Sequence, residues 1–221
     1  MYRRPTAALF LCAVLSVTAY AGPELDSAVV DLAHGWAKIS YKTPDSEKDA
    51  AFRNLIAKSR QVSQDFPARA EPMIWQAIIL ASAAKAEGGL SALSKAKEAR
   101  DLLLAAEKIN PGALNGSAYD SLGSLYAKVP GWPIGFGDKK KAREYLAKAF
   151  TLDPNGIDTN FFYGEFLADQ GEYAKASEHL TRALNAPARA GREDADVGRR
   201  DEVSQLLAWL GEKHGAQVIN R

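Results

Sequence analysis

The sequence predicts an all-α protein built from antiparallel helix pairs, about four pairs with one further helix at the C-terminal end. Through most of its 221 residues, apolar side chains recur at steps of three and four, the spacing of one buried helical face. Prolines and glycines follow these periodic segments, as they do at helix ends. No window alternates apolar and polar residues between turn signals, as a strand would. Residues 22–221 suit a single helical domain.

Four helices are expected in the first half of the chain, at residues 24–41, 45–64, 73–87 and about 90–109. Pro44 ends the first helix, and Asp45 or Ser46 can cap the second. A Gly-Gly pair breaks or bends the third, and Asn-Pro-Gly closes the fourth. The side chains expected to face inward are Leu25, Val29, Leu32, Trp36, Ile39, Phe52, Leu55, Ile56, Ser59, Val62, Trp75, Ile78 and Ile79.

Five more helices are expected at residues 117–128, 139–152, 158–169, 173–184 and 201–213, with Asp138 capping the second of them. Residues 188–200 are highly charged and poor in apolar side chains, so this segment is expected to be irregular or mobile. The last helix is expected to cap the array, because its apolar face needs a neighbour. That face carries Val203, Leu206, Leu207, Trp209 and Leu210.

Internal repetition is the strongest signal in the sequence. Small Ala and Gly recur where two helices would cross closely, and large residues recur beside them to fill the gaps. Three successive units carry these residue types: Trp75, Ile78, Ala99, Leu103, Ala106 and Pro111; then Tyr119, Leu122, Gly123, Tyr126, Ala142, Leu146, Ala149 and Pro154; then Tyr163, Gly164, Leu167, Gly171, Ala176, Leu180 and Ala183.

On these residues the chain resembles tetratricopeptide repeat proteins, whose units are about 34 residues long. The resemblance covers residues 72–190, with units at about 72–111, 116–154 and 157–190, and more loosely residues 24–67. The first unit is lengthened by eight residues and the second by seven, while the third departs from the pattern at Asn160 and Pro187. The resemblance implies a right-handed superhelical array, with residues 201–213 as its C-terminal cap.

A narrower resemblance rests on the segment VPGWPIGFGDKKKA, from residue 129 to 142, and on the unequal repeat lengths. Both features are similar to the T component of tripartite ATP-independent periplasmic (TRAP) transporters. That resemblance implies an exported helical protein wrapped around a ligand pore, with a solute-binding protein as its partner. The sequence departs from that family in having no lipid-anchoring cysteine.

The first residues predict export. Arg3 and Arg4 precede an apolar run at 7–17, and Ala19 and Ala21 form an A-x-A site, so a signal peptide at 1–21 is expected to be cleaved after Ala21. The only cysteine, Cys12, lies in that run, so disulfides and thiol catalysis are not expected in the mature chain. No other stretch could span a bilayer, and the predicted location is the bacterial periplasm.

Charge and motifs exclude several classes of function. Without residues 1–21 the chain has 26 basic and 27 acidic residues, which argues against a nucleic-acid partner. His34, His179 and His214 are scattered, and the hydrolase, metalloprotease and phosphate-loop motifs are missing. The sequence therefore predicts no enzyme activity, no cofactor and no metal.

The insertion at 129–138 is one candidate binding element. Prolines and glycines give it a defined shape, and it carries the apolar Val129, Trp132, Ile134 and Phe136. These side chains either fold back as a plug between helix pairs or, with Trp132 and Phe136 leading, line a binding site. Lys139, Lys140 and Lys141 follow, either as a solvated run or as a contact for an anion or an acidic partner.

The other candidate is the concave face that the first helix of each pair presents in such arrays. Repeat positions place Asp120, Ser124, Asp158, Phe161, Glu165 and Asp169 there, with Gln76 and Leu80 in the earlier unit. Phe161 and Phe162 could clamp an extended peptide or an apolar ligand, and the acidic side chains would favour a basic one. The alternative is an ordinary solvated groove with Phe162 in the core.

These observations predict a non-catalytic scaffold for a protein or peptide. The alternative is a small-molecule-binding accessory subunit of a TRAP-type solute transporter, whose ligand is apolar or anionic. An enclosed apolar pocket beside Trp132 and Phe136 would favour the transporter role, and an open charged groove the scaffold. The two lengthened turns, between Trp75 and Ala99 and between Tyr126 and Ala142, are expected to meet at one edge.

Overall fold

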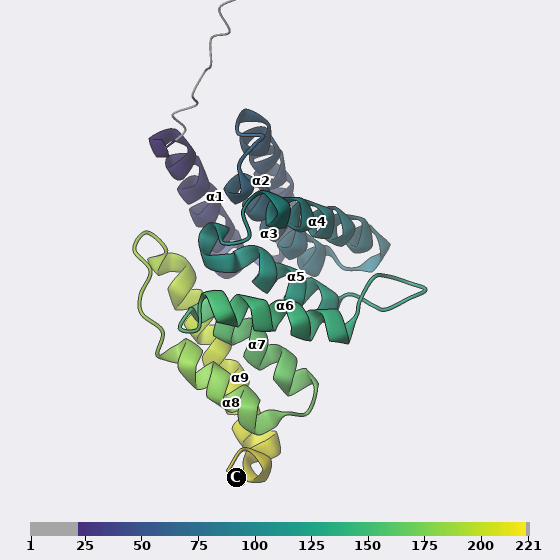
Figure 1. Ribbon diagram of the computed structural model, residues 1–221, viewed down its shortest axis with the longest axis vertical. Helices are drawn as coiled ribbons and strands as arrows, with labels where there is room; N and C mark the ends of the chain where they lie inside the picture. Colours follow the sequence, from purple (N-terminus) through teal and green to yellow (C-terminus); the bar gives the residue numbers. More distant parts are fainter. Residues whose placement is uncertain (1–21, 220–221) are drawn as a thin grey trace, which may run out of the picture.

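The computed structural model describes residues 22–219, apart from the side chains of Leu90 and of residues 216–219. The expected signal peptide at 1–21 lies outside the described residues. Within 22–219 the chain forms nine α-helices and one short 3-10 helix, with no strand (Figure 1). They are α1 (Gly22–Lys42), α2 (Asp45–Asp65), α3 (Ala70–Glu87), α4 (Gly89–Ile109), η1 (Ala113–Gly116), α5 (Ser117–Lys128), α6 (Lys139–Leu152), α7 (Ile157–Asp169), α8 (Tyr173–Leu184) and α9 (Glu193–Ile219).

The predicted all-α fold class is confirmed, and the first eight helices lie within three residues of their expected ends. Local chemistry explains this agreement. The carboxylate of Asp138 accepts hydrogen bonds from the backbone N–H groups of Lys140 and Lys141 at the start of α6, as an N-cap does. Gly88 and Gly89, with φ of 67° and 70°, make the turn between α3 and α4.

Neighbouring helices pack against each other in chain order, so the colours in Figure 1 pass from purple at one end to yellow at the other. Two glycines set the helix spacing inside pairs. A Cβ on Gly123 of α5 would lie 2.6 Å from Leu146 Cγ of α6, and one on Gly164 of α7 would lie 2.8 Å from Leu180 Cγ of α8. The same residue types therefore serve the same purpose in both pairs.

The segment 188–200, expected to be irregular or mobile, is helical from Glu193 onward, so that prediction is wrong over most of its length. Three acidic residues in the first turn of α9 suit the positive end of the helix dipole. Among the other charged side chains of the segment, Arg189 and Arg199 pair with Asp158 of α7, and Arg200 pairs within α9 and with the Ala186 carbonyl. A periodic sequence pattern reveals a helix through its apolar face. The first turns of α9 carry mainly charged side chains, so that pattern is missing there.

Helix α9 also does more than cap the array, because it packs against α1 as well as α7 and α8. A Cβ on Gly198 would lie 2.3 Å from Tyr41 Cγ, so α9 approaches the Tyr41 ring closely. The His34 Nδ1 atom lies 3.0 Å from an Asp194 carboxylate oxygen, and the Tyr41 hydroxyl donates to Glu202 at 3.2 Å. The last helix thus contacts the first, and the array curves round on itself.

The two lengthened turns meet, as expected. The extra residues of the earlier unit lengthen α3 and α4 and form no long loop, whereas those of the later unit form the loop at 129–138. A Cβ on Gly135 would lie 3.2 Å from Leu93 Cδ2, and the Arg100 guanidinium lies 4.5 Å from the centre of the Phe136 ring. Beyond these contacts the loop projects to the right in Figure 1.

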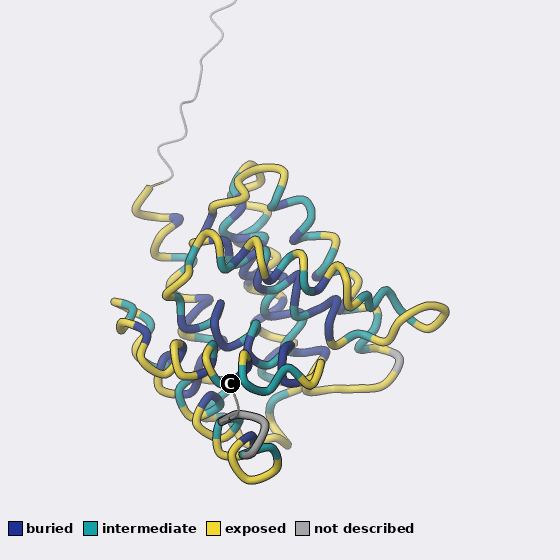
Figure 2. The backbone as a smooth tube through the Cα atoms, turned by 60° about the horizontal axis from the view of Figure 1, so that its bottom comes forward, coloured by how far each residue is buried: buried dark blue, intermediate teal, exposed yellow. Residues whose placement is uncertain are grey.

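The core follows the inner sides of the helices, where Figure 2 shows the buried segments in dark blue. Most side chains expected to face inward are buried, but Val29 and Ile78 are only partly buried. Gln76 and Leu80, placed on the concave face by sequence, are instead buried between helices, which corrects that expectation. Among the described residues, none of the helices has the length and apolarity needed to cross a membrane.

Candidate ligand-binding cavity

The inner face of the curved array lines a cavity of about 1060 Å³ that is partly open to solvent. Side chains from α1, α2, α3, α4, α5, α7 and α9 line it, so both halves of the chain contribute. Pockets for small molecules are commonly about 300–1,000 Å³. The space is therefore large enough for one.

One wall of the cavity is apolar and largely aromatic. The Trp36 and Trp75 rings meet edge to face with centroids 6.1 Å apart, and Trp36 Nε1 donates a hydrogen bond to Ser82 Oγ at 2.8 Å. This bond fixes the indole against α3. The wall also includes Phe52, Ile78, Leu93, Leu125, Phe161 and Phe162.

The projecting loop contributes to the cavity through Val129, Pro130 and Ile134. Its two aromatic residues take no part: Trp132 is 89 % exposed, and Phe136 packs edge to face on Tyr126 with centroids 5.6 Å apart. The plug interpretation thus holds for Val129 and Phe136, which pack against the core. Trp132 and Ile134 remain exposed, so the expectation that Trp132 and Phe136 line the pocket is wrong.

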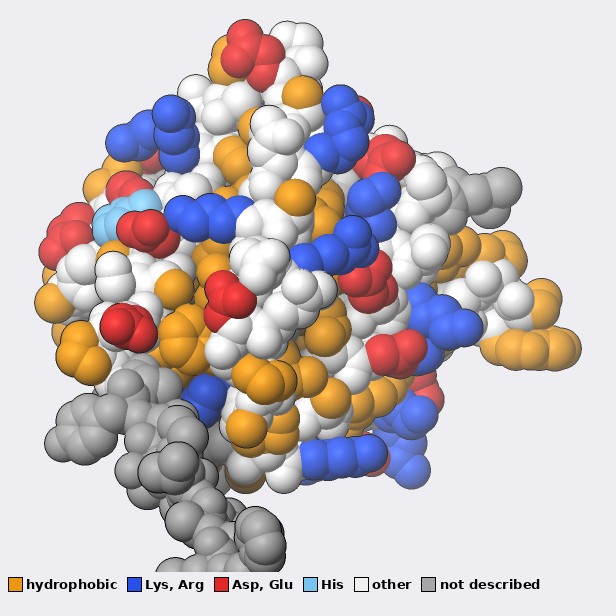
Figure 3. Space-filling view, turned by 90° about the horizontal axis from the view of Figure 1, so that it is seen from above, with side chains coloured by type: hydrophobic (Ala, Val, Ile, Leu, Met, Phe, Trp, Pro, Cys, Tyr) orange, Lys and Arg blue, Asp and Glu red, His pale blue; other side chains and the backbone are white. Residues whose placement is uncertain are grey.

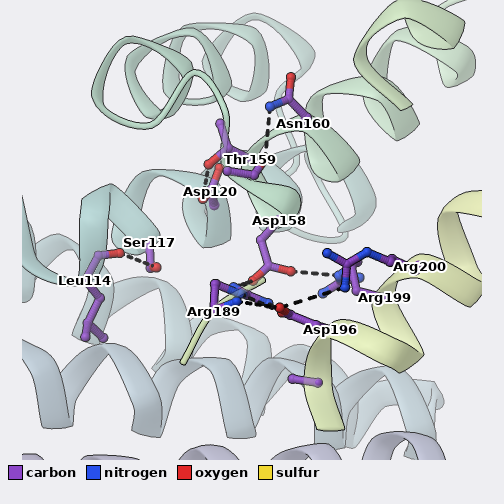
Figure 4. Close-up of polar contacts among 12 residues, drawn as sticks. Leu114, Ser117, Asp120, Asp158, Thr159, Asn160, Arg189, Asp196, Arg199 and Arg200 are labelled. Carbon is purple, nitrogen blue, oxygen red and sulfur yellow. Dashed lines mark hydrogen bonds and ion pairs between the residues drawn. The ribbon is translucent and has the colours of Figure 1, made fainter. Parts of the chain in front are cut away.

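Asp120 is the buried acid of the cavity wall, with only 4 % of its surface exposed. Thr159 Oγ1 donates to its Oδ2 atom at 2.9 Å, as Figure 4 shows, while Oδ1 has no hydrogen-bond partner. Burial raises the pKa of Asp120 to about 8, and the nearby Asp158 and Asp153 add to the effect. Asp120 therefore holds its proton near neutral pH and can donate one hydrogen bond.

Next to the Phe161 and Phe162 end of the aromatic wall lies a group that we call the ionic cluster: Asp158, Arg189, Asp196, Arg199 and Glu202 (Figure 4). The Asp158 carboxylate takes 2.6 Å and 2.7 Å contacts from Arg189 and Arg199. Burial alone would raise the pKa of Asp158, but the two guanidinium charges outweigh it and hold the pKa far below its ordinary value.

Arg199 links the cluster to the aromatic wall and to α1. Its guanidinium lies 4.3 Å and 4.8 Å from the ring centres of Phe161 and Phe162, and it pairs with Glu202 at 2.6 Å. The hydroxyl of Tyr41 donates to the same Glu202 carboxylate. Burial is the main reason that the pKa of Tyr41 is raised. The cluster thus ties α1, α7 and α9 together around the cavity.

A left-handed turn also borders the cavity. Leu114 and Asn115 have φ of 49° and 55°, and Gly116 follows at 83°. Leu114 and Asn115 both line the space, and Ser117 Oγ donates to the Leu114 carbonyl at 2.6 Å. A leucine is seldom found in this conformation, and such strained residues are often retained beside binding sites.

Most of the residues predicted on the concave face are brought together, and the exceptions are Gln76, Leu80 and Asp169. Asp120, Ser124, Phe161 and Glu165 line the cavity beside Asp158. Asp169 does not line it, and instead pairs with Lys128 at 2.8 Å near the rim.

The lysine run makes one contact that the sequence did not predict, a hydrogen bond to a backbone carbonyl group. Lys139 Nζ donates to the Ala127 carbonyl at 2.7 Å, at the C-terminal end of α5, where a cation is favoured. Lys140 is exposed, and Lys141 lies over the Tyr126 ring at 5.3 Å. None of the three lines the cavity.

Sequence reasoning missed the arginines of the site, because it assigned Arg189, Arg192 and Arg199 to an irregular segment. A signal was present: Arg192, Arg199 and Glu202 are spaced by seven and three residues, which places them on one face if the segment is helical. Trp36 and Trp75 were expected in the core, and both are buried, yet both also line the cavity.

The histidines do not form a site. His34 faces Asp194, while His179 Nδ1 lies 3.0 Å from the buried Asn160 Oδ1, which explains the polar residue at that repeat position. Burial and the nearby Arg182 lower the pKa of His179. Within the described part of the chain, no His, Cys, Asp or Glu residues are grouped in a way that could hold a metal ion.

In comparisons with known proteins, no family model matches the chain, and a search of curated proteins found no match. The two resemblances noted in the sequence therefore stay predictions. The functional argument rests on the cavity.

Proposed function

We propose that this protein is a non-catalytic binding protein that holds a small molecule with an apolar body in its cavity. The observation that carries the proposal is a space of about 1060 Å³ in which aromatic side chains face charged ones. Ligand pockets commonly combine an apolar lining with a few converging polar groups. Of the two roles that the sequence predicts, this geometry favours the small-molecule one.

The closed shape of the array supports a small ligand over a long peptide. Because α9 packs against α1, the concave face is not open along its length. The ionic cluster lies where an open array would leave a groove, and it joins α7 to α9 by buried ion pairs. An extended peptide would have to break these pairs to pass.

We extend the proposal to a biological role: an accessory subunit that passes a ligand to a solute transporter. The support is the similarity of residues 129–142 to the T component of TRAP transporters, together with the projection of that loop beside the cavity. A solute-binding protein would be the partner. This role depends on ligand binding, so ligand binding is tested first.

The test uses N-phenylnaphthylamine, a neutral dye whose emission rises in apolar surroundings. We expect one dye to bind per chain, and the rise to be lost in Ser121→Phe, which fills the cavity from α5. The control is Ser204→Phe on the exposed side of α9, which should bind as the wild type does. Equal emission from Ser121→Phe and the wild type would overturn the proposal.

A protein scaffold is the second candidate function, and the exposed loop favours it. Trp132 is 89 % exposed and Ile134 68 % exposed. Figure 3 shows hydrophobic side chains gathered on the projection at the right of the view, where Figure 1 places the α5–α6 loop. Apolar side chains on a projecting loop are typical of protein contacts.

This second candidate is tested by retention on immobilised protein. We expect a partner held by the wild type to be lost with Trp132→Ser and kept with Trp209→Ser, which changes an exposed tryptophan on α9. If all three proteins retain the same partners, Trp132 is not the contact and the scaffold role loses its support.

A further inference from the structure

The carboxylates of the ionic cluster already have their cationic partners. Asp158 is held by Arg189 and Arg199, and Asp196 by Arg189 at 2.6 Å with Arg200 further away at 3.9 Å. Glu202 takes contacts from Arg199 and from the Tyr41 hydroxyl. Each of these anions therefore has a direct cationic contact, and the charges of Asp158 and Asp196 also act to raise the pKa of the nearby Arg192, against the larger effect of burial.

Among the described cations that line the cavity, Arg192 and Lys85 form no ion pair, and Arg192 is the one that is partly buried. It lines the cavity, and its guanidinium lies over the Trp75 ring, 4.9 Å from the ring centre. Its Nε is buried without a hydrogen-bond partner, and it forms none of the ion pairs found in the described part of the chain. Burial lowers the pKa of Arg192, which reflects a charge held away from water. A partly buried cation with no direct hydrogen bond to an anion is less well stabilised than one that is paired.

We infer that the ligand is an organic monoanion, a carboxylate attached to an apolar body, and that its carboxylate pairs with Arg192. This inference rests on the proposed function and names its ligand class. A guanidinium matches a carboxylate with two parallel hydrogen bonds. Arg192 is the one partly buried cation of the lining without an ion pair, so a single negative charge suits it, whereas the second charge of a phosphate dianion would have only the exposed Lys85 to meet it.

The rest of the lining agrees with this assignment. Asp120 keeps its proton near neutral pH, so it adds no competing negative charge and can donate to a ligand oxygen. Glu165 is paired with Lys128 at 3.1 Å. Burial also raises the pKa of Asp153. Lys85 at the rim is exposed and would attract an anion from solution. The aromatic wall beside Arg192 would hold the apolar body.

The test is competition against the neutral dye at pH 7 by two ligands that differ only in charge, naphthylacetate and naphthylacetamide. We expect the acid to displace the dye at a concentration at least tenfold lower than the amide. Dye binding by itself reports the proposed function. An acid no better than the amide would overturn the carboxylate assignment and leave the proposed function standing.

Variants locate the effect. Arg192→Gln should remove the preference for the acid while keeping dye binding, and Arg192→Lys should restore part of it. The matched control is Arg182→Gln, which removes an arginine stacked on Phe150 at 5.5 Å outside the cavity. An unchanged preference in Arg192→Gln would overturn the role of Arg192. The comparison of the acid with the amide on the wild-type protein is a test by itself. The inference can therefore still be overturned if a variant fails to fold.

Discussion

Asp120 makes the stability of the fold depend on pH in the direction opposite to that of an ordinary acid. Its pKa is raised to about 8, so the folded state keeps a proton that the unfolded state releases above about pH 4. The free energy of unfolding therefore falls between these two values as pH rises, by at most about 1.4 kcal/mol per pH unit from this group.

Asp120→Asn should abolish that contribution, since an amide has no proton to lose and its oxygen can still accept from Thr159. We expect the variant to be more stable than the wild type at pH 8 and close to it at pH 4. Denaturant unfolding of both proteins over this range measures the difference. His179 titrates in both proteins, so it cancels. A difference that does not grow with pH would contradict the protonation of Asp120.

Asp158 should contribute the largest single electrostatic term. Its side chain is 24 % exposed and Arg199 is 7 % exposed, so Asp158→Asn removes one of the two anions that Arg189 and Arg199 each contact in a largely buried setting. We expect a loss of about 3 kcal/mol in the free energy of unfolding. The control is Asp169→Asn on the same helix, whose side chain is 42 % exposed beside Lys128 and whose loss should cost under about 1 kcal/mol.

The shifted pKa of Asp158 also predicts how the cost of Asp158→Asn changes with pH. The pKa of Asp158 is lowered in the folded protein, so its contribution is present above the ordinary pKa of about 4 and is lost as pH falls below it. The gap between wild type and Asp158→Asn should therefore close in acid. Equal costs for the Asp158 and Asp169 variants at pH 7 would show that the ion pairs around Asp158 are not buried ones.

At the scale of elements, the closure of α9 on α1 depends on Gly198. An alanine there would place its Cβ 2.3 Å from the Tyr41 ring, so α9 must shift. We expect Gly198→Ala to lower the free energy of unfolding by about 1–3 kcal/mol through overpacking. Chemical denaturation measures it.

Gly211 of the same helix supplies the control. A Cβ there meets nothing within 4 Å, so Gly211→Ala should raise stability by about 0.5–1 kcal/mol through helix propensity alone. If both alanines were stabilising, α9 would not depend on close contact with Tyr41. The contact between α9 and α1 would then not close the cavity on that side.

Eight helices could be predicted because their signals are local: apolar periodicity, caps such as Asp138, and glycines at turns. The start of α9 could not, because its charged residues find their partners on α1 and α7, far away in the sequence. The concave-face residues were predictable from repeat positions, as Asp120 and Phe161 show. The place of Arg192 in the site could not be predicted, since it depends on contact with Trp75, which belongs to another repeat unit.

The whole molecule is a curved array of helices built around a cavity. The first and last helices meet, an aromatic wall contacts the ionic cluster, and a loop projects beside the space. Residues from widely separated parts of the sequence build this cavity, so its existence could not be predicted from any one motif. The projecting loop, which the sequence marked as one of two candidate binding elements, supplies part of the lining.

The most direct test of the cavity as a binding site is the small molecule that the protein carries from its own cells. Protein purified without denaturation would be extracted with organic solvent and the extract analysed by mass spectrometry. We predict one compound per chain in the wild type and in Ser204→Phe, and a strongly reduced amount in Ser121→Phe. Extracts that are the same for all three proteins would contradict the account.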